Sequence, residues 1–158
     1  MSRFRKILVP IDFSDHSSAA FDLAIDLART SGATLHLLHC YPIDPGAISP
    51  YGIVLPEGFD RDVREAAGRE LARWADKVGA ANVPVEQHLS SMFPAEVIAR
   101  TADELGADLI VMGTRGLSGL KHVLLGSIAE RVLRIAHCPV LSVKAAAKGS
   151  ASGGPRPA

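Results

Sequence analysis

The stretch KILVPI at residues 6–11 is an apolar run with the length of one β-strand. Runs of similar character recur at residues 35–40, 107–112 and 139–143. Strands that are apolar on both faces are typical of a parallel sheet covered by helices on both sides. A further run at residues 83–89 alternates apolar and polar residues and contains Pro84, which favours an edge strand.

Between these runs, apolar residues recur at helical spacing. The spacing predicts a first helix over residues 14–31, with Ser14 as its N-cap and Gly32 as its stop, and a second helix that ends before Gly79. A third helix is expected from Pro94 to just before Gly106.

The fourth helix is predicted to open at Ser127. Ser127 and Glu130 have the spacing of a capping box, and the helical period directs Ile128, Val132 and Ile135 inward. Five strands therefore alternate with four helices. Right-handed crossovers turn this order into an α/β fold, a single doubly wound, open, parallel five-stranded sheet with helices on both faces.

The size of the chain fits one domain of this kind. Its 158 residues are enough for one core, and we assign residues 1–145 to that domain and residues 146–158 to a disordered tail. The proline-rich segment at residues 41–58 is expected to be a lid or a disordered excursion.

Charge and cysteine content restrict the function. The 17 basic and 17 acidic residues cancel, so no overall field favours nucleic acid or an anionic membrane. Cys40 and Cys138 are distant in sequence and lie in apolar surroundings, which indicates buried, reduced thiols. Pro10 and Asp12 interrupt the first apolar run too early for a signal peptide or a membrane span, so we expect a cytoplasmic protein.

The segment VMGTRGLSGLKHVLLGS at residues 111–127 contains the strongest functional signal. Gly113 follows a strand, and Gly126 immediately precedes a helix. The unpaired amides of a first helical turn and the helix dipole favour a phosphate group, and glycine has no Cβ to keep phosphate oxygens away. Alternatively, the glycines only permit turns and Ser127 only caps a helix.

The spacing of this segment resembles the universal stress protein family. Its nucleotide-binding members carry G, two residues, G, nine residues, then G and Ser or Thr, which Gly113, Gly116, Gly126 and Ser127 match. The stretches ILVPIDFS, LLHC and CPVLSVK extend the similarity over most of the domain.

The resemblance implies a sheet order of 3-2-1-4-5 and an ATP site at the ends of strands one, two and four. It implies ATP, with Mg²⁺ arriving on its phosphates, held by Pro10, Asp12, Cys40, Met112, Gly113, Arg115, Gly116, Gly126, Ser127 and Ile128. In this arrangement Asp12 contacts the ribose or adenine side, and the main chain of Cys40 contacts the adenine edge. Alternatively, Asp12 is a simple helix cap. The alternative for Arg115 and Lys121 is that both are solvated loop charges. Met92 stands where the family usually has glycine. The resemblance therefore supports phosphate binding more strongly than selectivity for the base.

No catalytic or metal-binding set follows from the linear spacing. His36 and His39 point to opposite faces of a strand, the other histidines lack neighbouring ligands at metal spacing, and no G-x-S-x-G motif occurs. We therefore expect a non-enzymatic, ATP-binding regulator or sensor of the stress response, compatible with weak ATP hydrolysis, with protein partners that the sequence does not identify. A slow ATPase, a nucleotidyl transferase or a nucleotide-free interaction module are the alternatives.

Dimerisation is expected at the last strand. The PVLSV run at residues 139–143 is apolar on both faces, and an uncovered edge of this kind invites pairing. The family resemblance implies a homodimer through this strand.

Overall fold

The computed structural model describes residues 4–41, 56–91, 94–115 and 125–145. Its elements are β1 (Lys6–Pro10), α1 (Asp15–Ser31), β2 (Thr34–Cys40), α2 (Phe59–Ala80), β3 (Val85–Ser90), α3 (Pro94–Leu105), β4 (Leu109–Gly113), α4 (Ser127–Ile135) and β5 (Val140–Val143). The strands form one parallel sheet in the order β3-β2-β1-β4-β5. The predicted doubly wound fold, its strand order and the two edge strands are therefore confirmed.

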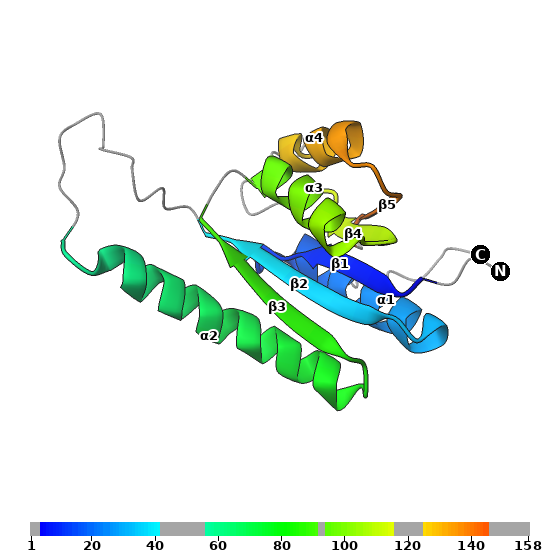
Figure 1. The fold of residues 1–158 in the computed structure, drawn as a ribbon, viewed down its shortest axis with the longest axis horizontal. Helices are drawn as coiled ribbons and strands as arrows, with labels where there is room; N and C mark the ends of the chain where they lie inside the picture. Colours follow the sequence, from blue (N-terminus) through cyan, green and yellow to red (C-terminus); the bar gives the residue numbers. More distant parts are fainter. Residues whose placement is uncertain (1–3, 42–55, 92–93, 116–124, 146–158) are drawn as a thin grey trace, which may run out of the picture.

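Helices cover both faces of the sheet (Figure 1). One core lies between the sheet and helices α1 and α2, where Phe21 packs edge-on against Trp74 at 4.9 Å between ring centroids. The other core joins alternate residues of the same strands, such as Leu8 and Ile110, to α3 and α4. This two-sided burial explains why the central strands are apolar on both faces.

The ends of the helices test the predicted boundaries. Ser14 caps α1 by accepting a hydrogen bond from the Ser17 amide, and Gly32 ends this helix in the left-handed conformation with φ of 74°, as predicted. Helix α2 continues through Gly79 to Ala80, so the end predicted before Gly79 was two residues too early.

The capping box predicted for α4 is wrong. Gly126 is the N-cap and provides no side chain, Ser127 is already the first helical residue, and Glu130 pairs instead with Arg134 at 2.9 Å. Ile128 was also expected to point inward, but it is 40% exposed, and Ala129 is buried in its place. The N-cap of α4 is therefore Gly126, one residue before the N-cap that the spacing of Ser127 and Glu130 predicts.

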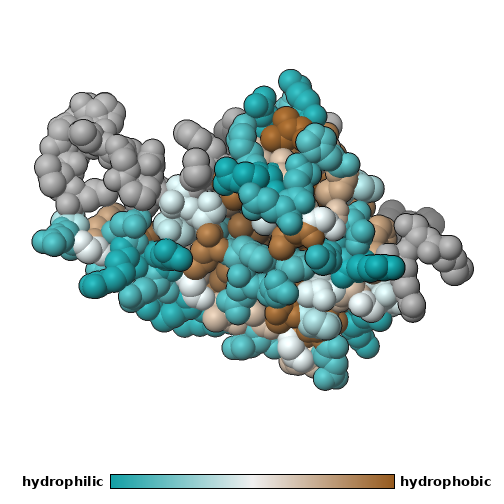
Figure 2. Space-filling model, viewed as in Figure 1, coloured by the Kyte–Doolittle hydropathy of each residue, from teal (hydrophilic) through white to brown (hydrophobic). Residues whose placement is uncertain are grey.

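The surface and the cysteines complete the description. Figure 2 shows a mostly hydrophilic outer surface on α2, and none of the helices in the described part of the chain is long and apolar enough to span a membrane. Cys40 and Cys138 are free, as expected, but both are half-buried rather than fully buried.

Several expectations fall on residues that the structure does not describe. These are Gly116 and Lys121 of the glycine segment, Met92, most of the proline-rich segment (residues 42–55) and the tail at residues 146–158. The predicted roles of these residues stay predictions.

Candidate functional site

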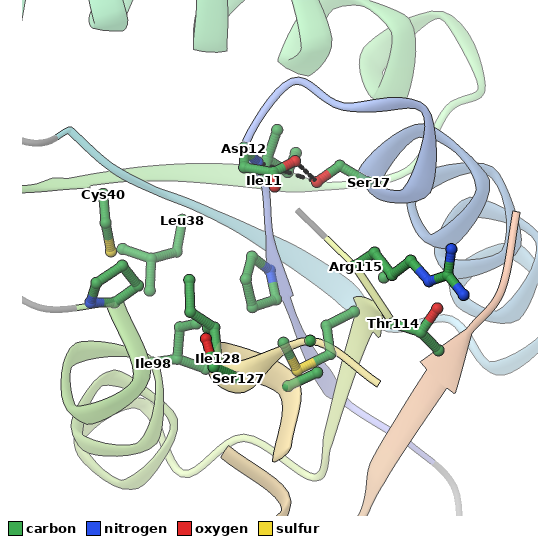
Figure 3. Close-up of a pocket in the computed structure, with 16 residues that line it drawn as sticks. Ile11, Asp12, Ser17, Leu38, Cys40, Ile98, Thr114, Arg115, Ser127 and Ile128 are labelled. Carbon is green, nitrogen blue, oxygen red and sulfur yellow. Dashed lines mark hydrogen bonds between the residues drawn. The ribbon is translucent and has the colours of Figure 1, made fainter. Parts of the chain in front are cut away.

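A pocket opens at the carboxyl ends of β1 and β4, beside the start of α4 (Figure 3). These two strands are neighbours in the sheet, yet the chain leaves β1 toward β2 on one side and leaves β4 toward β5 on the other. The strand order therefore reverses here, which is where open α/β sheets form their ligand crevices. The cavity has a volume of about 370 Å³, within the range of small-molecule sites.

The structure brings the predicted site residues together around this one cavity. Nine of the ten line it: Pro10, Asp12, Cys40, Met112, Gly113, Arg115, Gly126, Ser127 and Ile128. The tenth, Gly116, lies outside the described residues. Residues from four separate parts of the sequence thus meet in space.

The start of α4 presents to the pocket main-chain amides that have no acceptor within the helix. The first intrahelical bond runs from the Glu130 amide to the Gly126 carbonyl at 2.9 Å, so the amides of residues 127–129 come before this bond. The N-cap is glycine, which has no side chain to accept a hydrogen bond from them. Gly126, Ser127 and Ile128 all line the cavity, which places the positive end of the helix dipole at its wall.

The two described glycines of the motif are needed for a reason that the sequence did not reveal. A Cβ on Gly113 would lie 2.8 Å from the main-chain carbon and oxygen of His16 in the first turn of α1. A Cβ on Gly126 would lie 3.1 Å from the Thr114 carbonyl oxygen, which accepts the Gly126 amide at 2.6 Å. Close packing of the protein's own backbone therefore accounts for Gly113 and favours glycine at position 126, independently of any approach by phosphate.

Asp12 occupies a local hydrogen-bond network beside α1. Its Oδ1 accepts from the Ser14 amide at 2.9 Å and from the Ser17 hydroxyl at 2.6 Å, so the helix-cap alternative describes part of its role. Its Oδ2 has no hydrogen-bond partner within the described ranges. Figure 3 shows Asp12 and Ser17 across the cavity from Ser127 and Ile128.

Strand β2 extends past β1 at the pocket. The last paired residues are Pro10 and Leu38, and the Ile11 amide donates to the Leu38 carbonyl at 2.8 Å. The Ile11 carbonyl then accepts from Nδ1 of His39 at 2.6 Å, which replaces a further bond of the ladder. The main chain of Cys40 consequently lies beyond the paired part of β1, where it is available to a ligand edge.

The Cys40 thiol is expected to be unreactive. Burial raises the pKa of this thiol from 9.0 to about 11, so the group is neutral at physiological pH. It therefore contributes a small apolar surface to the pocket rather than a nucleophile.

We expect Cys40 to react slowly with iodoacetamide. At a pH of about 8 the raised pKa reduces the thiolate fraction by about 100-fold relative to an ordinary cysteine. The rate should be followed in a Cys138→Ala background, by mass spectrometry, with the urea-unfolded chain as the fast reference. A folded rate equal to the unfolded rate would contradict this description of the pocket.

The same pKa shift makes stability depend on pH. The folded chain keeps the Cys40 proton above pH 9.0, whereas the unfolded chain loses it. The free energy of unfolding should therefore fall as the pH rises from 9.0 toward about 11, and this slope should be reduced in Cys40→Ala. Urea titrations across that range measure it.

Two polar atoms at the end of β4 lack partners. The hydroxyl oxygen of Thr114 and Nε of Arg115 are buried without a hydrogen bond in the described structure. Unsatisfied buried polar atoms are costly, and they often mark the place of a missing ligand or water. In Figure 3 the Arg115 side chain extends away from Leu38 and Cys40, on the side of the cavity near Thr114.

Sequence reasoning missed part of the lining. Ile11, Ser17, Leu38, Pro94, Ile98, Thr114 and Ala129 also contact the cavity. Ser17 had a signal, because it lies three residues after the predicted N-cap Ser14 and thus in the first turn beside Asp12. Ile98 had none, since only the tertiary packing of α3 brings it to this edge.

Comparisons with known proteins agree with this arrangement. The model of the universal stress protein family matches residues 3–144. Universal stress protein YxiE of Bacillus subtilis is 38% identical over 150 residues, which cover 89% of this chain and 99% of that protein. Among solved structures, hypothetical protein MJ0577 superposes with a TM-score of 0.79 at 26% identity, covering 90% of this chain and 97% of that one. A universal stress protein in complex with cAMP gives a TM-score of 0.64 at 28% identity, covering 91% and 99%.

Proposed function

Because the chain belongs to the universal stress protein family, we propose that it is an ATP-binding member, a nucleotide-dependent regulator in the stress response. The observation that carries the proposal is the start of α4, where the glycine N-cap supplies no side-chain hydrogen bond and the first-turn amides lie at a cavity where the strand order reverses. A structural relative was solved with cAMP, which shows that this fold can hold an adenine nucleotide.

The phosphate side of the proposal rests on several weak contributions. A helix dipole contributes about 0.3–1 kcal/mol, whereas micromolar affinity requires about 8 kcal/mol. The amides of residues 127–129, the Ser127 hydroxyl, the Thr114 hydroxyl and the Arg115 guanidinium supply further donors at the same edge. Mg²⁺ would be held mainly by the phosphates themselves.

The base side is apolar. Pro10, Leu38, Ile98, Met112 and Ile128 line the cavity and offer a surface for a flat ring. The main chain of Cys40, beyond the paired part of β1, supplies polar groups for the edge of the ring. Oδ2 of Asp12, which has no hydrogen-bond partner among the described residues, is the carboxylate oxygen proposed for a ribose hydroxyl.

We propose binding rather than turnover as the activity. The Cys40 thiol is neutral, and Oδ1 of Asp12 is engaged with Ser14 and Ser17, so neither group is poised as a strong nucleophile or base. A regulator of this kind would signal through the conformation of the nucleotide-bound state.

The direct test is native mass spectrometry of the purified protein, followed by calorimetric titration with MgATP. We expect a co-purifying adenine nucleotide or saturable binding of one ATP per chain. No binding at about millimolar nucleotide would refute the proposal, since that limit corresponds to only about 4 kcal/mol. Turnover at about 1 per second or faster would instead assign the chain to the enzymes.

We also propose that β5 forms a homodimer contact. This strand is an edge of the sheet, and Leu141 is 37% exposed on it. Pairing of two copies would cover both the apolar side chain and the open backbone edge.

Leu141→Glu is expected to shift the protein toward monomer, because two buried carboxylates would face the same apolar contact. Sedimentation velocity at micromolar concentration measures this shift. Leu23→Glu is a matched control, since Leu23 is equally exposed at 37% but lies on α1. A monomeric wild-type protein under these conditions would contradict the proposed contact.

A further inference from the structure

Three potential metal ligands meet on the sheet, outside the lining of the pocket. His36 of β2 is the register partner of Glu86 on β3, and His88 follows Glu86 by two residues and so lies on the same face. One ligand atom from each of these residues lies within 4.8 Å of the other two. Linear spacing did not reveal this group, because its members come from two strands whose register is set by the fold.

The distances fit a shared ion. Nδ1 of His36 is 3.1 Å from Nε2 of His88 and 3.4 Å from Oε2 of Glu86. Ligands about 2.0–2.1 Å from a tetrahedral Zn²⁺ are separated from each other by about 3.3 Å. The side chains therefore need little movement to surround one ion.

We propose that His36, Glu86 and His88 bind one divalent transition-metal ion of the Zn²⁺ class. Two imidazoles and one carboxylate suit Zn²⁺ and leave a fourth position for water. His36 is 2% exposed and anchors the set, whereas the Glu86 side chain is 60% exposed and leaves a path for the ion from solvent.

The surroundings of the His36 ring limit the strength of the site. Nε2 of this ring is buried without a partner in the described structure, so the ring lacks the second hydrogen bond that strengthens many zinc sites. We thus expect micromolar affinity rather than a structural zinc.

The metal-free alternative is a hydrogen bond between the two imidazoles. A single proton shared by His36 and His88 also explains their 3.1 Å separation and the stacked rings, whose centroids are 5.4 Å apart. It gives no role to the third ligand, Glu86, which is the register partner of His36. The two explanations differ in what the protein does when Zn²⁺ is added.

The three proposed ligands do not line the proposed nucleotide pocket, although the two sites are neighbours. Leu38, which lines the pocket, follows His36 by two residues along β2, a distance of about 7 Å, and is the register partner of His88. Helix α3 contacts β1 and β2, and α4 contacts α3 and β5. The nearby cation Lys6 is tethered, since its ammonium donates to the Leu105 carbonyl at 2.9 Å.

The test is a Zn²⁺ titration of chelator-treated full-length protein against a chromophoric competitor. We expect one strong equivalent per chain, with a dissociation constant of about 10 μM or tighter. His88→Ala and Glu86→Gln should each weaken it by about tenfold or more. His137→Ala is the matched control, because it removes an exposed histidine that also contacts a carboxylate, Asp103, at 2.9 Å. Its affinity should stay within about twofold of wild type.

A second readout guards against nonspecific binding. Co²⁺ bound to the wild-type chain should give the intense visible absorption of a four-coordinate ion, and this band should be absent in His88→Ala. Glu86→Gln keeps the test valid if His88→Ala misfolds, because Glu86 is exposed. Equal Zn²⁺ affinity in wild type and Glu86→Gln, or a loss in His137→Ala as large as in His88→Ala, would overturn the proposal.

Discussion

Replacing Ser127 with glutamate is expected to weaken ATP binding by about 100-fold, or about 2.7 kcal/mol, while the fold becomes slightly more stable. The new carboxylate would stand at the first position of α4, beside the amides that we assign to phosphate. Two like charges at about 4 Å repel by about 4 kcal/mol at an effective dielectric constant near 20, which is enough for this loss. The same charge favours the helix dipole by about 0.3–1 kcal/mol.

This substitution is informative because it is expected to lower the ATP affinity while it raises the stability of the fold. Calorimetry with ATP measures the affinity, and urea unfolding without nucleotide measures the stability. Ser127→Gln is the matched control, because it has the same size without the charge, and it should retain most of the affinity. If Glu and Gln at this position bound ATP equally well, phosphate would not lie at the start of α4.

Gly113→Ala is expected to destabilise the protein by about 2–3 kcal/mol, near the upper end of overpacking effects. The added methyl group would lie 2.8 Å from the His16 main chain, and a helix backbone moves much less readily than a flexible side chain. The free energy of unfolding, measured by urea titration, should therefore fall. A shift of the first turn of α1 would also disturb Ser17 and Asp12, so ATP affinity should fall with it.

Gly79→Ala provides the control for this prediction. Gly79 lies inside α2, and a Cβ there would meet no atom within 4 Å. Alanine at that helical position should stabilise the fold by about 0.5–1 kcal/mol. If both substitutions changed the stability in the same direction, the close approach of α1 to β4 would not be the reason for Gly113.

Much of the fold was predictable because burial on both faces leaves a simple signal. The runs that became β1 and β4 are apolar at consecutive positions, which is typical of central strands covered on both faces of a parallel sheet. The alternating run with Pro84 became the edge strand β3. The start of α1 was equally readable, since Ser14 caps its helix through a local hydrogen bond.

The start of α4 was harder to predict for a physical reason. Ser127 and Glu130 have the right spacing for a capping box, but the bond between the Gly126 amide and the Thr114 carbonyl fixes Gly126 as the cap. That bond joins the helix to the end of β4, and a local pattern does not contain it. Tertiary contacts likewise gave Gly113 and Gly126 a packing role, whereas the sequence offered only ligand approach or turn formation as reasons for these glycines.

The residues of the candidate site were likewise predictable from the sequence only in part. Asp12 and Ser127 were identified through the resemblance to the universal stress protein family, and the fold class agrees because it places strand ends and this helix start at one edge. Ile98 and the group formed by His36, Glu86 and His88 depend on helix placement and strand register, so they emerged only from the structure.

The most direct measurement of the central claim compares ATP with adenosine in a variant that lacks one main-chain donor. Ser127→Pro removes the first amide of α4, and the helix should survive because proline is favoured at this position and the φ of −69° and ψ of 155° at Gly126 suit a residue before proline. Ser127→Ala removes only the hydroxyl and serves as the control. By calorimetry, we expect ATP to bind at least about tenfold more tightly than adenosine to wild type and Ser127→Ala, and this advantage to shrink markedly in Ser127→Pro. Equal binding of ATP and adenosine to the wild-type protein, or an unchanged ATP advantage in a folded Ser127→Pro variant, would contradict the assignment of phosphate to these amides.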